Sequence, residues 1–243
     1  MNTDRKTDHE TDYTFPGRRV AAVSMILGPV LLLTGTLLRS QVNFFFPDQL
    51  KAMSAHPALM TAAYTCFLAG NVVLWPAIVA LSTKIGRTRP ALAAWAGVSV
   101  LIGLFERTFH AGIDQAALGL AERRGAGYAE SVVSESYQDL HLFSFLSFTI
   151  MFGWYALAFA AYRSKALGVV QSIGLATMGL LPLGVLKGTE IVSIIGTAGL
   201  CVALLPAGVR ALLESPKPSR RSVLLAAIGV PVLGALAFAS TLG

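Results

Sequence analysis

Three side chains that can exchange protons or bind a metal ion recur four residues apart in the stretch GLFERTFHAGIDQAALGL, residues 103–120. Glu106, His110 and Asp114 occupy positions i, i+4 and i+8, so on a helix they form one stripe along a single face. Arg107 stands next to the first of them. A carboxylic acid beside an imidazole is a pair that can donate and recover a proton.

The stripe lies at the end of an apolar run, residues 91–113, that is long enough to cross a membrane. If this span starts near Leu92, Glu106 lies about 21 Å along it, at ~1.5 Å per residue, in a hydrocarbon layer about 30 Å thick. A charge at that depth costs a few kcal/mol unless it faces the protein interior and finds a partner. Three interpretations follow: a solvated helix end, an outward-opening pocket, or an ion pair that joins two helices.

A second polar cluster precedes the next apolar run. Asp139 and His141 stand at its start, where Asp139 has the alternative role of a helix cap. If the two runs are antiparallel neighbours, this cluster meets His110 and Asp114. The remaining residues of the predicted lining are Arg39, Arg107, Asn71, Trp75, Lys187 and Glu190.

The composition is that of an integral membrane protein. Hydrophobic residues make up 54% of the chain and charged residues 13%, with a mean hydropathy of +0.64. A soluble domain carries about 25% charged residues. We therefore expect a multi-pass protein of a cell membrane with membrane lipid as its partner. The net charge of +6 is not a nucleic-acid footprint, because the basic residues lie in short loops.

The apolar runs predict an all-α fold with a polar cytoplasmic tail, residues 1–18, and one transmembrane domain, residues 19–243. Seven runs are long enough to span: about 20–38, 59–82, 91–113, 141–162, 167–186, 190–212 and 222–241. The segment 41–59 is too polar to span and predicts an outer interfacial helix that could roof a cavity.

The basic residues indicate which end faces the cytoplasm. With the N-terminus inside, thirteen of the 19 Lys and Arg residues fall on the inner side. Seven spans then place the C-terminus outside. Most acidic residues fall on the outer side, so we expect the residues that could carry out chemistry to lie on that side too.

Three chemistries fit such a pocket. A carboxylic acid kept protonated in an apolar cavity could protonate an alkene or epoxide, and aromatic π faces could then stabilise the carbocation. A metal site could use His110, Asp114 and His141 with Asp139 or Glu106. The third possibility is binding without catalysis, as in a transporter, an immunity protein or a sensor. The aromatic candidates are Trp75, Trp95, Phe105, Phe109, Phe145, Phe148 and Trp154.

Two resemblances bear on this choice. The stretches FPDQLKAMSAHPALM, GLFER and YRSKALGVVQSIGL look like an uncharacterised family of small multi-pass bacterial membrane proteins, a resemblance of layout that implies no activity. The size, the seven spans and the acidic pocket are similar to integral-membrane terpene cyclases. The seven-span zinc hydrolases related to alkaline ceramidase need a histidine pair on the last span, and residues 222–241 have none.

The leading prediction is therefore an enzyme that cyclises a hydrophobic isoprenoid or prenylated substrate by proton donation, with no metal and no cofactor. Glu106 is the candidate acid, with His110 or Arg107 setting its protonation. Asp114, Asp139 and His141 surround it. An enzyme predicts a closed, aromatic-lined cavity around Glu106, whereas a carrier predicts a polar path to the cytoplasmic side. The alternative is a non-enzymatic membrane protein.

Overall fold

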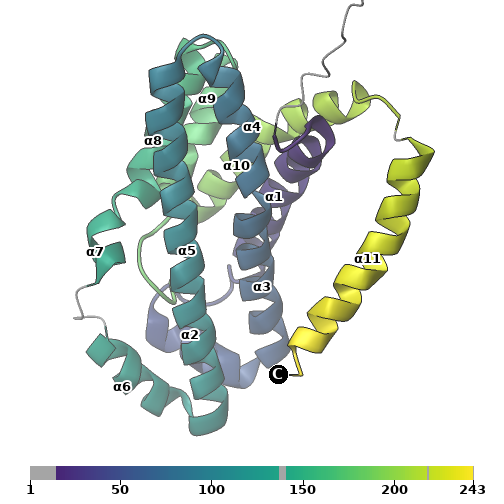
Figure 1. Ribbon diagram of the computed structural model, residues 1–243. Coiled ribbons are helices and arrows are strands. Elements are labelled where there is room, and N and C mark those ends of the chain that lie inside the picture. The colour runs from purple at the N-terminus through teal and green to yellow at the C-terminus, as the bar shows by residue number, and fades with distance from the viewer. Residues whose placement is uncertain (1–14, 137–140, 218, 243) are drawn as a thin grey trace, which may run out of the picture. The chain divides into compact units, whose positions relative to one another are not determined.

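The computed structural model describes residues 15–136, 141–217 and 219–242 and divides the chain into two units. The first unit ends at Leu213 and contains the helices that build the candidate site (Figure 1). The second begins at Glu214 and contains one helix, α11 (Arg220–Ser240). Each unit is described by itself.

Six helical stretches in the described part of the chain are long and apolar enough to cross a membrane, which makes this a multi-pass helical membrane protein. Helix pairs α3–α4 and α7–α8 each form one such stretch, the first interrupted at residue 74 and the second, near its start, at residues 147–148. The six are α1 (Arg18–Leu38), α3 (Pro57–Val73) with α4 (Trp75–Gly86), α5 (Pro90–Arg124), α7 (Leu142–Leu146) with α8 (Thr149–Arg163), α10 (Ile191–Leu213), and residues Val223–Ser240 of α11.

The predicted span 167–186 is not one continuous helix. It consists of α9 (Val169–Ala176) and a 3₁₀ turn, η1 (Thr177–Leu180), followed by ten non-helical residues, 181–190. The break follows from Pro182, which removes a backbone N–H and disfavours the helical conformation of Leu181, which is extended with ψ 131°. Residues 181–190 are called the connecting segment below.

The third predicted span is longer than expected. Helix α5 continues beyond residue 113 to Arg124, so Asp114 lies inside a helix and not at its end. Gly125, with φ 89°, ends the helix in a conformation that glycine adopts without strain. Helix α6 (Ala126–Ser136) follows directly, so the connection between the predicted spans 91–113 and 141–162 is helical at residues 114–124 and 126–136. The expected outer interfacial segment contains helix α2 (Phe46–Ala55).

Helix α5 is the central positioning element of the first unit. Helices α4 and α8 pack against it, as do α3, α2 and α6 (Figure 1). The approach of α8 is very close, since a Cβ on Gly103 would lie 2.9 Å from the Thr149 carbonyl oxygen, and one on Gly153 would lie 3.0 Å from the Ser99 carbonyl carbon. Small residues at such contacts are typical of membrane helix pairs.

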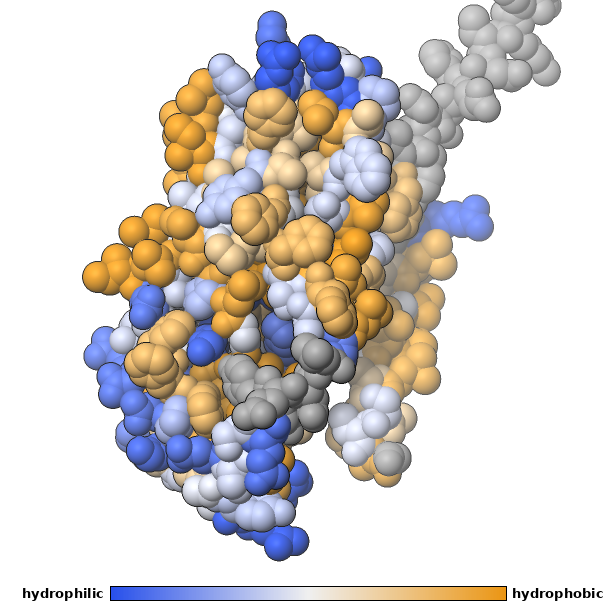
Figure 2. All heavy atoms as spheres, turned by 90° about the vertical axis from the view of Figure 1, so that its left-hand side faces the viewer, coloured by the Kyte–Doolittle hydropathy of each residue, from blue (hydrophilic) through white to orange (hydrophobic). Residues whose placement is uncertain are grey.

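Apolar side chains cover the middle of the face that Figure 2 shows, between two hydrophilic ends. At one end, the α4–α5 and α8–α9 connections meet, where Lys84 Nζ donates a hydrogen bond to the Ala166 carbonyl at 2.9 Å. This end exposes basic side chains that the sequence-based prediction assigns to the cytoplasmic side: Arg87, Arg89, Arg163 and Lys165. Large exposed apolar residues of α5 and α8 are Trp95, Val98, Phe105, Phe152, Tyr155 and Phe159.

Candidate functional site

A large cavity of about 780 Å³ opens beside the second half of α5. Small-molecule sites usually enclose about 300–1,000 Å³, and this cavity lies within that range. Helices α5, α6 and α7 and the connecting segment line it. Aliphatic side chains dominate the lining: Ile113, Ala116, Ala117, Leu120, Val132, Val133, Leu183 and Val185. Its polar side chains are His110, His141, Ser144, Ser147 and Lys187.

Glu106 lies behind this cavity and is fully buried, with 0% of its surface exposed. The Ser147 hydroxyl donates a hydrogen bond to Glu106 Oε1 at 2.6 Å. His110 Nε2 lies 4.0 Å from the same oxygen. Glu106 Oε2 is buried and has no hydrogen-bond partner among the described residues. Ser147 and His110 both line the cavity, so two side chains connect the buried carboxyl to it.

The contact between α5 and α8 places Ser147 on Glu106. Gly103 is one turn before Glu106 on α5, and its missing side chain lets the first turn of α8, at Thr149, approach the α5 backbone. Ser147 lies in the turn between α7 and α8, two residues before Thr149. The Ser147–Glu106 hydrogen bond therefore depends on a backbone contact that only a glycine permits.

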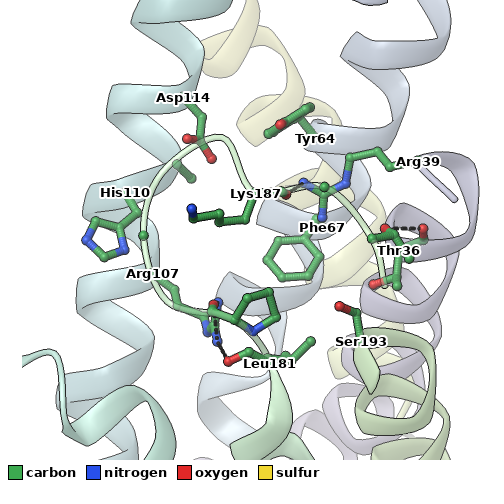
Figure 3. Close-up of a pocket in the computed structure, with 15 residues that line it drawn as sticks. Thr36, Arg39, Tyr64, Phe67, Arg107, His110, Asp114, Leu181, Lys187 and Ser193 are labelled. Atoms are coloured by element: carbon green, nitrogen blue, oxygen red, sulfur yellow. Dashed lines mark hydrogen bonds between the residues drawn. The ribbon is translucent and has the colours of Figure 1, made fainter. Parts of the chain in front are cut away.

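A second, smaller cavity of about 50 Å³ lies on the other side of His110. A single water needs about 10–15 Å³, so this cavity has room for a small polar group. Figure 3 shows Arg39, Tyr64 and Phe67 at one side of it and Arg107, His110 and Asp114 at the other, with Lys187 between them. Its other polar side chains are Thr36, Thr189 and Ser193.

Three charged side chains around the small cavity bind the backbone of the connecting segment. Arg107 donates hydrogen bonds at 3.4 Å to the carbonyl oxygens of residues 181 and 182. Asp114 Oδ1 accepts the Leu186 N–H at 2.5 Å, and Arg39 Nη1 donates to the Lys187 carbonyl at 3.2 Å. Non-helical backbone inside a membrane needs such partners, because lipid supplies none. Arg39, Arg107 and Asp114 thus anchor the connecting segment.

Asp114 offers a direct test of this anchoring role. Asp114→Ala leaves the N–H of fully buried Leu186 without its acceptor, so we expect a loss of about 1–3 kcal/mol of stability. Asp114→Asn keeps a carbonyl oxygen at the same position and should lose much less. Thermal unfolding of both detergent-purified variants measures the difference. Equal destabilisation by the two changes would mean that the charge, not the hydrogen bond, holds the segment.

Arg39 is held from two directions. Its guanidinium carbon lies 4.5 Å from the ring centroid of Tyr64 and 4.8 Å from that of Phe67, at cation–π distance. Its Nε donates at 3.4 Å to the carbonyl of Gly35, on its own helix. Only 6% of its surface is exposed. The charge is therefore presented to the small cavity from a fixed position.

The structure separates the predicted site residues into groups. His110 lines both cavities, and Glu106 and His141 belong with the large one. Arg107 and Asp114 line the small one. Asp139 lies outside the described residues.

Asn71 and Trp75 line neither cavity. Asn71 Nδ2 donates to the Leu104 carbonyl at 2.8 Å and to Thr108 Oγ1 at 2.9 Å, which ties α3 to α5. Trp75 packs edge-on against Phe105 at 5.5 Å. Both contacts join neighbouring helices, as polar and aromatic side chains of membrane bundles do.

His141 packs against an aromatic side chain of α5. Its ring centroid lies 5.1 Å from that of Phe109. In the described part of the chain, no three His, Cys, Asp or Glu side chains come together as metal ligands. The alternative metal site built from His110, Asp114 and His141 therefore has no described ligand set.

Sequence reasoning missed Ser147 and the connecting segment. Ser147 carries no motif, since a serine in an apolar run is common. The stretch PLGVLKGTE, residues 182–190, contains Pro182, Gly184 and Gly188, which are signals of a broken helix. Those signals could have replaced the predicted span 167–186 with a short helix and a non-helical segment.

Comparisons with known protein families, with curated proteins and with solved structures give no match for this chain. The resemblances drawn from the sequence are thus supported only as far as a multi-pass helical membrane architecture with six candidate spans.

Proposed function

We propose that this protein is a membrane enzyme that carries out proton-transfer chemistry on a lipid-soluble isoprenoid, with Glu106 as the acid. The observation that carries the proposal is the hydrogen bond from Ser147 to the buried Glu106 carboxyl, at the wall of an apolar cavity of about 780 Å³. The reaction we propose first is cyclisation started by protonation of a carbon–carbon double bond.

The surroundings of Glu106 favour a proton donor over a structural carboxylate. A carboxylate fixed by an ion pair would have a cationic partner in contact, but the described group of this kind within 4.0 Å of the Glu106 carboxyl is the His110 imidazole, at 4.0 Å, and it is charged only when protonated. Glu106 Oε2 has no hydrogen-bond partner in the described chain. Burying an unpaired oxygen costs less free energy when the carboxyl group is protonated than when it is ionised. A neutral, water-excluded acid is the form that can give up a proton to a substrate.

The proposed step is balanced within the protein and the substrate. In the proposed acid form Glu106 is protonated at Oε1, so the donor of this hydrogen bond reverses and the Glu106 carboxyl donates to the Ser147 oxygen. The carboxyl passes its proton to that oxygen while the Ser147 hydroxyl proton forms a C–H bond at the substrate alkene. The π bond breaks, a second alkene supplies the electron pair that closes a ring, and the resulting cation loses a proton. That proton returns to the Glu106 carboxylate by the reverse path, so the product is an isomer of the substrate.

One expectation for a cyclase is not met. The described residues that line the large cavity are mainly aliphatic, and none is Phe, Tyr or Trp. Of the aromatic residues expected to stabilise a carbocation, Trp95, Phe105, Phe145 and Phe148 are more than half exposed on the protein surface. This lining favours a second candidate function, the binding or carriage of the same apolar ligand without catalysis.

Blocking the cavity tests both candidates. Ala116→Trp places an indole in the cavity, whereas Ala94→Trp places one on an exposed position of the same helix, outside the cavity lining. Detergent-purified protein is incubated with linear C15 and C20 isoprenoids, with binding and product formation followed separately. We expect Ala116→Trp to lose both binding and cyclised product, and Ala94→Trp to keep both.

The outcomes separate the candidates. Binding without any product in the wild type would favour the non-catalytic candidate. Equal binding by Ala116→Trp and the wild type would remove the large cavity as the ligand site and contradict both.

A further inference from the structure

The small cavity carries a surplus of positive charge next to the large apolar cavity. Three cationic side chains, Arg39, Arg107 and Lys187, line it together with one carboxylate, Asp114. With His110 neutral, the lining has two more positive than negative charges. None of the three cationic groups has a carboxylate oxygen of a described residue within 4.0 Å.

Hydrogen bonds to the connecting segment give a structural role to part of this positive charge but not to all of it. Arg39 and Arg107 bind carbonyl groups of the connecting segment. Arg107 Nε is nevertheless buried without a hydrogen-bond partner among the described residues. Lys187 Nζ lies 5.3 Å from the Phe44 ring centroid and makes no hydrogen bond to the described chain. Cationic groups held partly away from water without a counter-charge are costly, so a cavity that keeps buried Arg39 and half-buried Arg107 and Lys187 together suits an anion.

The two cavities adjoin each other. His110, Gly184 and Lys187 line both of them. A molecule with a long apolar part and a compact anionic end could therefore place the first in the large cavity and the second in the small one. The Ser147 hydroxyl, which connects Glu106 to the large cavity, would then face the apolar part of the molecule.

We propose that the small cavity binds a phosphate-type oxyanion between Arg39, Arg107 and Lys187, and that this oxyanion is the head group of the lipid whose chain fills the large cavity. The inference rests on the proposed function, and it narrows the substrate to an isoprenoid phosphate monoester.

Charge and geometry both favour phosphate. A phosphate monoester carries a charge of about −1.5 to −2 at neutral pH, which balances the two surplus positive charges of the cavity lining. A carboxylate, with one negative charge, balances only half of them. Guanidinium groups bind phosphate oxygens in paired hydrogen bonds, and a lysine adds a mobile point charge.

Lys187 is the best residue for a test, because its side chain takes no part in holding the connecting segment. The test measures dissociation constants of detergent-purified full-length protein for farnesyl phosphate, farnesol and inorganic phosphate. The variants are Lys187→Met, its charge-preserving counterpart Lys187→Arg, and Lys51→Met. Lys51 is an exposed lysine on α2 that does not line either cavity, so its loss controls for net charge.

The wild type is expected to bind farnesyl phosphate at least about tenfold more tightly than farnesol. Lys187→Met should remove most of that preference, because it weakens the binding of farnesyl phosphate far more than that of farnesol. Lys187→Arg should restore the preference, and Lys51→Met should leave it intact. Inorganic phosphate should weaken the binding of farnesyl phosphate and leave that of farnesol unchanged.

Other outcomes would overturn the inference. Equal affinity for the ester and the alcohol in the wild type, with no effect of inorganic phosphate, would leave the large cavity as a ligand site but reject the head-group site. If inorganic phosphate binds and Lys187→Met abolishes that binding, while the two lipids bind equally, the small cavity takes a free anion and the lipid assignment is wrong. If neither lipid binds, the proposed function fails together with the inference.

Discussion

Glu106→Gln is expected to lower the rate of product formation by about 10²–10⁴-fold, the contribution that a positioned acid usually makes. Glutamine has nearly the same shape and keeps an oxygen that accepts the Ser147 hydroxyl, so the fold and the cavity should be preserved. Its amide group has no proton acidic enough to transfer to an alkene. The measurement is turnover of a linear isoprenoid by equal amounts of folded wild-type and variant protein.

The matched control is Glu122→Gln on the same helix. Glu122 is exposed and does not line either cavity, so this change should leave turnover unaltered. Ser147→Ala adds a second comparison, since it removes the hydroxyl that connects Glu106 to the cavity but leaves the acid in place. Equal turnover by the wild type and Glu106→Gln would show that Glu106 is not the acid, whatever the substrate.

Gly103→Leu is expected to have the largest effect on stability. A Cβ at this position would lie 2.9 Å from the Thr149 carbonyl oxygen, 3.0 Å from its carbon and 3.1 Å from the Ile150 Cα. All three are backbone atoms, so α8 itself must move away from α5. Overpacking of this kind typically costs about 1–3 kcal/mol, and we expect the upper end of that range. The displacement would also separate Ser147 from Glu106.

Gly112→Leu provides the control on the same helix. A Cβ on Gly112 meets no atom within 4 Å, and leucine is the better helix former, so this variant should be as stable as the wild type or more stable. Thermal unfolding in one detergent compares the two. If Gly103→Leu unfolds at the wild-type temperature, the close approach of α5 and α8 is not a stabilising contact, and the positioning of Ser147 needs another explanation.

The apolar runs were sufficient to predict the class of protein. Runs of about 20 apolar residues must form helices in a membrane, because every backbone polar group needs a partner within the segment. Most predicted spans therefore have counterparts among the six candidate spans. The exception is 167–186, where one proline at position 182 outweighed the hydropathy of the run.

The i, i+4, i+8 spacing of Glu106, His110 and Asp114 was also sufficient to place these residues on one helix, α5. It did not determine what each would contact. Helical spacing determines the position of a side chain along the helix axis and the face of the helix on which it lies. Its contact partner depends on which segment packs against that face.

Only the tertiary structure decided the division of roles along that stripe. Glu106 faces Ser147, in the turn before α8, which the close approach of α8 to Gly103 brings near. Asp114 faces the backbone of the connecting segment, part of which the hydropathy of the sequence had predicted to be helical. The residues of these two hydrogen bonds are separated by 41 and 72 positions in the sequence, respectively. Local sequence determines local conformation, but a pocket made by such distant segments depends on how closely the helices can approach and where one of them breaks.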